Sequence, residues 1–177
     1  MKVAIYTLGC KVNLYESEVI MNSFKKSGYE IVDFEDNADI VIINTCTVTN
    51  TSDKKSRNII RQAVKKHENA VIVVMGCYSQ VRSADIKEID GVDIIIGNTK
   101  KSKVVSLVEE YLKNKKSITE IDDIMHTDFE PMELDTFETR TRAFVKIQDG
   151  CNNFCSYCII PYSRGNIRSK EKDDVVS

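Results

Sequence analysis

The stretch DIVIINTC, residues 39–46, decides the fold class of this chain. It is a nearly continuous run of apolar and β-branched residues, so as a strand it would be buried on both faces. Strands of that kind are typical of a parallel sheet that helices cover on both sides. Similar short apolar runs occur at residues 2–7, 29–34, 69–76 and 92–97. The sequence therefore predicts five strands.

The first segment between these runs has the pattern of a helix. Asn13 is followed by Glu16 at the spacing of a capping box, which predicts that Asn13 caps the helix. The helix is expected to run to about Lys26 and to stop at Gly28, because glycine adopts the left-handed conformation at a helix end.

Three more helices are expected further along the chain. Thr51 or Ser52 is expected to cap the second, and the third is expected around 80–89. The last helix carries one apolar stripe, formed by Val104, Leu107, Val108, Tyr111 and Leu112. Five strands that alternate with helices over residues 1–114 predict a five-stranded, parallel, flavodoxin-like α/β sandwich.

The rest of the chain differs in composition. Residues 117–139 hold eight acidic residues and no Lys or Arg, with Pro131 in the middle. We interpret 115–139 as an acidic linker that runs over the surface. A second unit is expected over 140–177, opened by the strand-like AFVKIQDG that leads to Cys151.

The overall composition is that of an ordinary globular protein, with 42% hydrophobic and 29% charged residues. The sequence has no run of about 18 apolar residues that would span a membrane, and its N-terminus lacks the pattern of a signal peptide. We therefore expect a cytoplasmic protein with no membrane partner. A net charge of -2 argues against RNA binding by this chain alone, although RNA can still be the substrate of a larger protein.

Six cysteines in a reducing compartment indicate metal binding or catalysis rather than disulfides. Cys10, Cys46 and Cys77 follow the first, third and fourth predicted strands. The carboxyl ends of parallel strands lie along one edge of the sheet, where open α/β sheets bind ligands, so we expect these thiols to share a metal or cluster. A structural zinc site needs four ligands, and neither His67 nor His126 is an obvious fourth. An iron–sulfur cluster held by thiolates fits better.

Two alternatives remain open at this edge of the sheet. The three cysteines can be small buried hydrophobes, or the edge can bind a flavin, with the Thr-rich loop 44–53 offering backbone amides to its phosphate. The flavin alternative leaves the cysteines unexplained. Gly9 and Gly76 each precede a cysteine, and glycine there would let the backbone turn tightly or approach a bulky ligand.

A second group of three cysteines lies within the short segment CNNFCSYC, at Cys151, Cys155 and Cys158. Gly150 before it and Pro161 after it are typical of a loop. No Cys or His occurs in the 19 residues that follow, so a closed zinc site is not predicted. Three thiolates leave one metal position open to a substrate or cofactor, as in catalytic metal sites. A non-catalytic iron–sulfur or zinc module and a flavodoxin-like electron carrier remain alternatives.

The segment CNNFCSYC resembles the signature of radical S-adenosylmethionine enzymes. The whole chain is similar to the methylthiotransferases of that superfamily, in the blocks TLGCKVNLYESE, INTCTVTNTSDKKSR, VVMGCYSQ and RTRAFVKIQDGCNNFCSYCIIPYSRG. The resemblance implies a methylthiotransferase domain over 1–114. It also implies the beginning of an incomplete radical barrel over 140–177, since α/β barrels run to about 200 residues or more.

The resemblance also implies two 4Fe-4S clusters. An auxiliary cluster would be held by Cys10, Cys46 and Cys77. The radical cluster, with S-adenosylmethionine on its open iron, would be held by Cys151, Cys155 and Cys158.

Other residues acquire expected roles from the same resemblance. Tyr157 would lie near the adenine of S-adenosylmethionine. Asn13 and Asn44 lie in the blocks around the auxiliary cluster, where they either shape that site or serve as helix-cap and turn residues. The family block after the second cysteine group contains Pro161, Arg164 and Gly165.

Within the family, the block TLGCKVN is most similar to enzymes that act on N6-threonylcarbamoyladenosine next to the tRNA anticodon. Enzymes that act on isopentenyladenosine tend to carry Gln-Met where this chain has Lys11 and Val12, and a third group modifies an aspartate of a ribosomal protein. The resemblance thus implies that C–SCH3 replaces C–H at adenine C2. It further implies a tRNA partner, bound mainly by parts of a longer protein, and an electron donor such as flavodoxin or ferredoxin.

Overall fold

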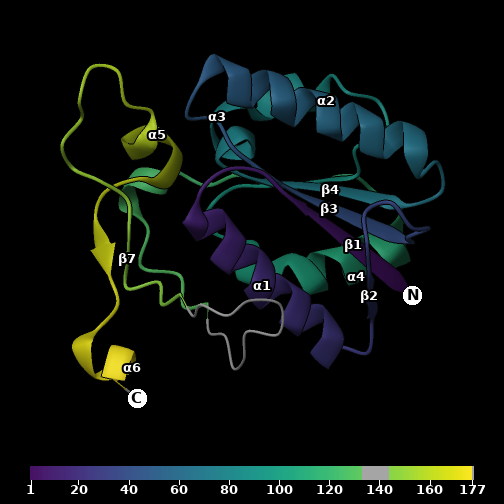
Figure 1. Cartoon of the computed structure of the whole chain (residues 1–177), viewed down its shortest axis with the longest axis horizontal. Coiled ribbons are helices and arrows are strands. Elements are labelled where there is room, and N and C mark those ends of the chain that lie inside the picture. Colours follow the sequence, from purple (N-terminus) through teal and green to yellow (C-terminus); the bar gives the residue numbers. More distant parts are fainter. Residues whose placement is uncertain (133–143, 177) are drawn as a thin grey trace.

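A six-stranded parallel sheet forms the centre of the computed structural model, which describes residues 1–132 and 144–176 (Figure 1). The strands are β1 Lys2–Thr7, β2 Glu30–Val32, β3 Ile40–Thr45, β4 Val71–Gly76, β5 Ile94–Ile96 and β6 Ile118–Glu120. Their order in the sheet is β2-β1-β3-β4-β5-β6. The order 2-1-3-4-5 is that of a flavodoxin-like sheet, which confirms the predicted parallel α/β architecture.

The strand count corrects the prediction, because the sheet has six strands rather than five. β6 lies within the segment interpreted as an acidic linker, and it pairs with β5 so that Ile118 lies opposite Ile94. Glu120 at the end of β6 forms an ion pair with Lys100, which compensates its charge at the edge of the sheet. A three-residue edge strand that contains an acidic residue has almost no period-two signal, so the sequence pattern concealed it.

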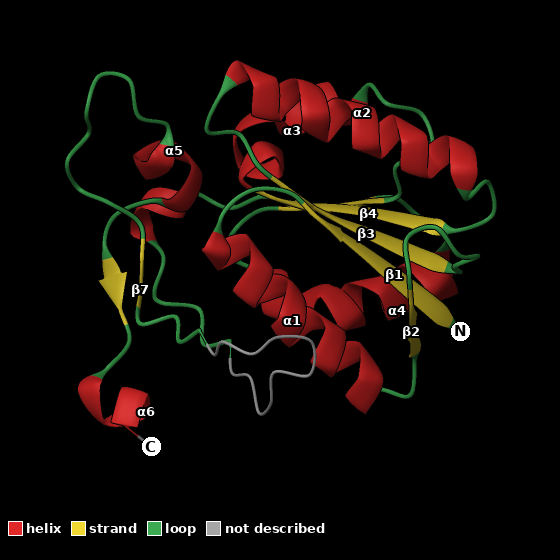
Figure 2. Ribbon diagram, in the orientation of Figure 1, coloured by secondary structure: helices red, strands yellow, loops and turns green. Residues whose placement is uncertain are grey.

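Helices cover both faces of the sheet, as strands without polar alternation require. The four long helices are α1 Lys11–Lys26, α2 Asn50–Lys66, α3 Cys77–Lys87 and α4 Val104–Asn114. α1 and α4 lie on one face, and α2 and α3 lie on the other (Figure 2). In β3, Ile40 and Ile42 belong to the core under α1 and α4, while Val41 and Ile43 belong to the core under α2 and α3. Each is fully buried and contributes about 1.5–3 kcal/mol of hydrophobic stabilisation.

The predicted capping box at the start of α1 is wrong. The N-cap residue is Cys10, and Asn13 lies buried inside the first turn. The Nδ2 atom of Asn13 donates hydrogen bonds to the carbonyl oxygens of Leu8 (2.7 Å) and Thr45 (2.9 Å). Glu16 is also fully buried and pairs with cationic side chains. Both side chains therefore hold other segments of the chain in place instead of capping the helix.

The other helix ends lie closer to their predicted places. α1 ends at Lys26, two residues before Gly28, whose φ is +83°. The cap of α2 is Thr49 rather than Thr51 or Ser52, and its side chain accepts a hydrogen bond from the backbone N–H of Ser52 (3.1 Å). α3 begins directly after β4, earlier than the predicted start.

Short elements make up the rest of the described chain: η1 Lys101–Lys103, η2 Ile124–His126, β7 Gln148–Asp149, α5 Ile160–Arg164, β8 Arg168–Ser169 and α6 Lys172–Val176. The strand-like AFVKIQDG contributes only the two residues of β7, which pair antiparallel with β8. This C-terminal part lies beyond the edge of the sheet where α1 begins (Figure 1). Ala143 and the predicted linker from 133 onward fall outside the described residues. Over the described ranges, no helix is long and apolar enough to cross a membrane.

The described part of the predicted linker packs against the sheet domain. Ile124 and Met132 are buried, and the hydroxyl of Tyr15 in α1 donates a hydrogen bond to the carbonyl oxygen of Met132 (2.6 Å). Glu130 accepts a hydrogen bond from the backbone N–H of Ser102 (2.8 Å). These contacts fix the path of the chain as it leaves β6. The domain boundaries at 114 and 140 stay a prediction.

Candidate functional site

The first three predicted ligands follow three adjacent strands of the sheet: Cys10 after β1, Cys46 after β3 and Cys77 after β4. Thr45 and Gly76 are partners in the β3–β4 register, so the two cysteines that follow them occupy neighbouring positions. The backbone N–H of Leu8 donates to the carbonyl oxygen of Asn44 (2.8 Å), which continues the pairing of β1 with β3 beyond the strand end. The topology thus brings the three cysteine positions to one edge of the sheet. We call this edge the first cysteine site.

Two glycines allow the tight turns at this edge. Gly9 has φ +108°, and a Cβ atom on it would lie 3.0 Å from the Sγ of Cys46. Gly76 has φ +104°, and a Cβ atom on it would lie 2.6 Å from the Oδ1 of Asn44 and from the carbonyl oxygen of Thr45. Residues with a side chain rarely adopt this conformation. The structure therefore agrees with the tight turns that the sequence predicted at both positions.

The thiol groups of the first cysteine site differ in exposure. Cys46 and Cys77 are 5% and 4% exposed, whereas Cys10 is exposed. Among the residues that the structure describes, no three His, Cys, Asp or Glu side chains lie together in a way that could hold a metal ion. The fold therefore gathers the three positions, and their sharing of one cluster stays a prediction.

The surroundings of the first cysteine site fit a thiolate-bound group. The Nδ2 atom of Asn98 donates to the Sγ of Cys77 (3.5 Å), and hydrogen bonds to sulfur are one way in which proteins tune iron–sulfur clusters. The Oδ1 atoms of Asn98 and Asn44 are buried and have no hydrogen-bond partner among the residues that the structure describes. Such orphaned polar atoms are rare in folded proteins and indicate a missing partner at the site. The donor set of three thiols matches iron–sulfur chemistry better than zinc.

The two histidines lie in other surroundings. His67 is buried at the end of α2, where its Nε2 lies 3.1 Å from the carbonyl oxygen of Phe34. His126 is exposed and lies 3.1 Å from Asp123. The contacts of the two histidines are thus with a backbone carbonyl and a carboxylate, and the absence of a histidine ligand stays a prediction.

The second cysteine site is the loop that carries Cys151, Cys155 and Cys158. Hydrogen bonds close its base, from the N–H of Cys151 to the carbonyl oxygen of Gly165 (3.0 Å) and from the N–H of Ile167 to the Oδ1 of Asn152 (2.8 Å). Gly150 has φ +78°, and a Cβ atom there would lie 2.0 Å from the carbonyl oxygen of Asn166. Pro161 lies in the first turn of α5, where its fixed φ favours the start of a helix.

The cysteines of the second site are more accessible than those of the first. Cys155 is exposed, and Cys151 and Cys158 are partly buried. Tyr157, the residue expected near the adenine, is 90% exposed. Its role as a cofactor contact stays a prediction.

Asn98 joins the two cysteine sites. In addition to its contact with Cys77, its Nδ2 donates to the carbonyl oxygen of Ser163 in α5 (2.6 Å). α5 directly follows the second cysteine loop and packs against α3, which begins at Cys77. One buried amide group therefore contacts a cysteine of the first site and the helix that follows the second cysteine loop.

A buried charge network makes a second connection. Arg164, at the end of α5, places its Nη1 2.9 Å from the Oδ1 of Asp149 and 3.1 Å from the Oε1 of Glu16. Lys146 reaches the same two carboxylates, at 2.9 Å from Glu16 and 2.7 Å from Asp149, and Lys101 pairs with Glu16. All five side chains are at most 6% exposed.

The charges of this network favour the ionised forms of Glu16, Asp149 and Arg164. Burial alone would raise the pKa of Glu16, but Lys101, Arg164 and Lys146 outweigh it and hold the pKa of that carboxyl well below its ordinary value. Burial likewise opposes ionisation of Asp149, and Arg164 and Lys146 lower its pKa in spite of it. The pKa of Arg164 lies well above its ordinary value, since Glu16, Cys77 and Asp149 outweigh the effect of burial.

Sequence reasoning missed this network. The sequence pattern indicates Glu16 as a capping residue and Arg164 only as part of a family block, and nothing in its local pattern marks Lys101 as buried. One signal was present: Glu16 lies four residues before Ile20 and so shares the buried face of α1. A carboxylate on such a face requires a cationic partner.

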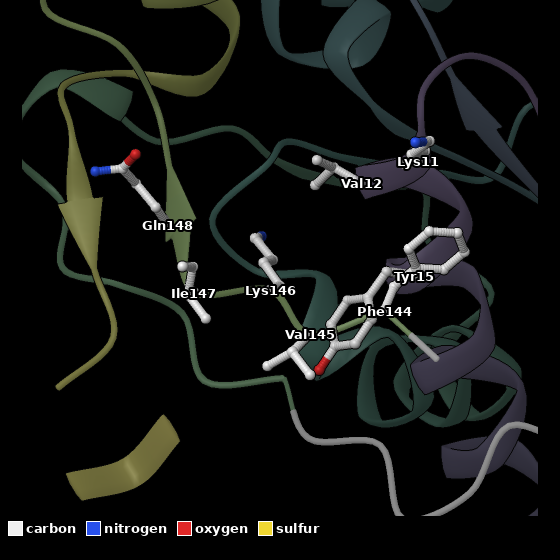
Figure 3. A pocket seen from close by; sticks show the side chains of 8 residues that line it. All are labelled: Lys11, Val12, Tyr15, Phe144, Val145, Lys146, Ile147 and Gln148. Carbon is white, nitrogen blue, oxygen red and sulfur yellow. The ribbon is translucent and has the colours of Figure 1, made fainter. Parts of the chain in front are cut away.

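A cavity of about 180 Å³ lies beside the first cysteine site. Figure 3 shows that α1 provides one wall, with Lys11, Val12 and Tyr15, and that residues 144–148 provide the other. The Nζ of Lys11 lies 5.9 Å from the centroid of the Phe144 ring. The cavity therefore separates the helix that begins at the first site from the segment that leads to the second.

Curated proteins that are similar to the chain include enzymes named as methylthiotransferases. It is 48% identical over 175 residues to a threonylcarbamoyladenosine tRNA methylthiotransferase of Bacillus subtilis, in a match that covers 98% of the chain and 39% of the relative. It is 34% identical over 182 residues to a ribosomal protein uS12 methylthiotransferase of Caldicellulosiruptor saccharolyticus, with 99% and 41% coverage. The chain thus spans about two fifths of the length of these relatives.

Solved structures give a match at the level of the fold. A radical S-adenosylmethionine methyltransferase from Kitasatospora setae matches with a TM-score of 0.57 and 15% identity, over 99% of the chain and 44% of that structure. Residues 2–97, more than half of the chain, match the uncharacterized protein family UPF0004. These residues contain β1 to β5 and all three cysteines of the first site. The chain therefore belongs to the UPF0004 family.

Proposed function

We propose that this chain is part of a radical S-adenosylmethionine methylthiotransferase, which converts N6-threonylcarbamoyladenosine next to the tRNA anticodon to its 2-methylthio derivative. The observation that carries the proposal is the pairing of two three-cysteine sites in one chain, with the second loop docked at the sheet edge that carries the first. The names of the relatives and the resemblance of the cysteine blocks support it.

Each cysteine group would hold one 4Fe-4S cluster, on Cys10, Cys46 and Cys77 and on Cys151, Cys155 and Cys158. When bound, the second cluster and S-adenosylmethionine would supply the radical chemistry, and the auxiliary cluster would carry the sulfur that receives a methyl group from another S-adenosylmethionine. The residues of the chain itself bind and orient these groups. Asn98 donates to the sulfur of Cys77, Gly9 and Gly76 keep the strand ends free of side chains, and the exposed ring of Tyr157 is proposed to pack on the adenine.

For the substrate we favour threonylcarbamoyladenosine over a ribosomal protein. The chain is 48% identical to the relative named for this nucleoside and 34% identical to the one named for uS12. Lys11 and Val12 line the cavity beside the first cysteine site, at the positions where isopentenyladenosine enzymes tend to differ. With a net charge of -2, the chain is proposed to leave most tRNA contacts to other parts of the protein, in the cytoplasm, with flavodoxin or ferredoxin as electron donor.

Mass spectrometry of tRNA nucleosides from a deletion strain tests the substrate. We expect the 2-methylthio derivative of threonylcarbamoyladenosine to disappear, that of isopentenyladenosine to remain, and complementation to restore the missing nucleoside. Loss of the isopentenyl derivative alone would overturn the choice of substrate. Anaerobic reconstitution of the full-length protein, followed by iron, sulfide and zinc analysis, tests the chemistry: two 4Fe-4S clusters support it, and zinc alone would refute it.

A further inference from the structure

We propose that Arg164 is a positioning residue that fixes the second cysteine loop against the strand ends of the first cysteine site. The docking itself does not depend on the proposed function, whereas its importance for a reaction between the two sites rests on that function. Arg164 acts through Asp149, Glu16 and Asn13 and not by contact with a reacting group.

On one side, Arg164 closes the second cysteine loop. Asp149 lies two residues before Cys151, and Arg164 lies six residues after Cys158. The Nη1 of Arg164 contacts both carboxylate oxygens of Asp149, at 2.9 and 3.0 Å. The residues that enter and leave the loop are therefore held by one buried guanidinium group.

On the other side, Arg164 contacts α1, which begins at the first cysteine site. Its Nη2 donates to the Oδ1 of Asn13 (2.7 Å), and its Nη1 reaches Glu16. Asn13 in turn donates to the carbonyl oxygens of Leu8 and Thr45, which directly precede Gly9 and Cys46. Asn13 therefore connects Arg164, at the end of the second loop, with the ends of β1 and β3 through three hydrogen bonds.

Asn98 provides the matching contact to the end of β4. Its amide group contacts both Cys77 and Ser163, the residue before Arg164. The three strand ends that carry the first cysteine site are thus all connected to the last turn of α5. Because interatomic distances in a packed interior are tightly constrained, these contacts set the separation of the two cysteine sites.

The charge balance explains why Arg164 can fix the loop without being essential for folding. The network contains three cations, Lys101, Lys146 and Arg164, and two carboxylates, Glu16 and Asp149. Without Arg164, two lysines would still face two carboxylates. A lysine at this position would keep the charge but lose the planar fork that reaches three partners at once.

The test compares Arg164→Met and Arg164→Lys with the wild type in the full-length protein. Hydrogen–deuterium exchange should rise about tenfold in residues 144–165 of the Met variant while β3 and β4 keep their protection, as for a local opening. Pulsed EPR between the two reduced clusters should give a broader distance distribution. The Lys variant should lie between the Met variant and the wild type in both measurements. The control is Arg57→Met, because Arg57 bonds to Tyr78 within the sheet domain, and it should change neither measurement.

Three results would overturn the proposal. Unchanged exchange and distances in Arg164→Met would show that the loop docks without the guanidinium. An equal loss of protection in β3 and β4 in both Arg164 variants would show a global stabilising role in place of positioning. Wild-type distances in Arg164→Lys would show that the fork is not needed. Failure of the proposed function would appear differently, as normal tRNA nucleosides in the deletion strain.

Discussion

The two cysteine sites are held in place by different means. The first is built from three strands that are distant in sequence, and its positions follow from the register of a buried parallel sheet. The second is one short loop, closed by glycines and backbone hydrogen bonds and docked through a few buried polar side chains. Perturbing the sheet edge should therefore affect global stability, whereas perturbing the loop should affect local order.

The charge network is where the two sites depend on each other, and Glu16→Gln should have the largest effect. The substitution leaves the fully buried Lys101 without its carboxylate, and removing one partner of a buried ion pair typically costs about 3–5 kcal/mol. Chemical denaturation should show this loss of unfolding free energy, and it should be seen both in the sheet domain and in the second cysteine loop. Glu35→Gln is the matched control, because Glu35 pairs with Lys66 but is 77% exposed, and such pairs contribute about 0–1 kcal/mol. Equal effects of the two substitutions would contradict the role of burial.

Gly76→Ala should perturb the first cysteine site and leave the second unchanged. The new methyl group would meet Asn44 and the Thr45 backbone at a φ of +104°, and strain of this kind costs about 1–3 kcal/mol. Under the proposed function, we expect iron analysis after anaerobic reconstitution to show lower occupancy at the first site and unchanged occupancy at the second. Gly28→Ala is the control, because Gly28 also has a positive φ but, apart from its chain neighbours, no atom of the described residues lies within 4 Å of the position that a methyl group would occupy. Chemical denaturation measures the free energy of unfolding of both variants. A loss for Gly76→Ala no larger than that for Gly28→Ala would show that the end of β4 can relax around the methyl group.

The sequence predicted much of this architecture because one simple signal recurs along it. Continuous apolar runs such as DIVIINTC require burial on both faces, and they predicted the sheet and the edge where Cys10, Cys46 and Cys77 lie. The contacts of Arg164 with Glu16 and Asn13 were beyond prediction, because they join residues about 150 positions apart through side-chain geometry that has no periodic signal. The edge strand β6 was also missed, because three residues are too few to establish a period.

The ionised network also predicts a pH dependence. The folded-state pKa values of Glu16 and Asp149 lie below their ordinary values of 4.5 and 3.8. Their contribution to stability is therefore fully present above those ordinary values and is lost as the pH falls through the folded pKa values. The destabilisation by Asp149→Asn should be constant from pH 7 to 5. Below the ordinary pKa of 3.8 it should shrink by up to about 1.4 kcal/mol for each pH unit, until the pH reaches the folded-state pKa of Asp149. Unfolding curves of both proteins at each pH measure it, and a difference that grows on acidification would contradict the sign.

Tyr157→Ala should have the smallest effect on stability and is the sharpest test of the second site as a local, exposed loop. With 90% of its surface exposed, the ring contributes little to folding, and we expect a change within about 0.5 kcal/mol. Under the proposed function, the same substitution should weaken binding of S-adenosylmethionine, because an aromatic contact contributes about 0.5–1.5 kcal/mol beyond its area. Tyr157→Phe should retain that contact, since stacking needs the ring and not the hydroxyl.

Tyr162→Ala is the matched control, because Tyr162 is an exposed tyrosine that packs on Phe154. Isothermal titration of the reconstituted protein separates the outcomes: equal binding by the Tyr157→Ala variant and the wild type would remove Tyr157 from the cofactor site, while the docking of the loop through Arg164 would be unaffected.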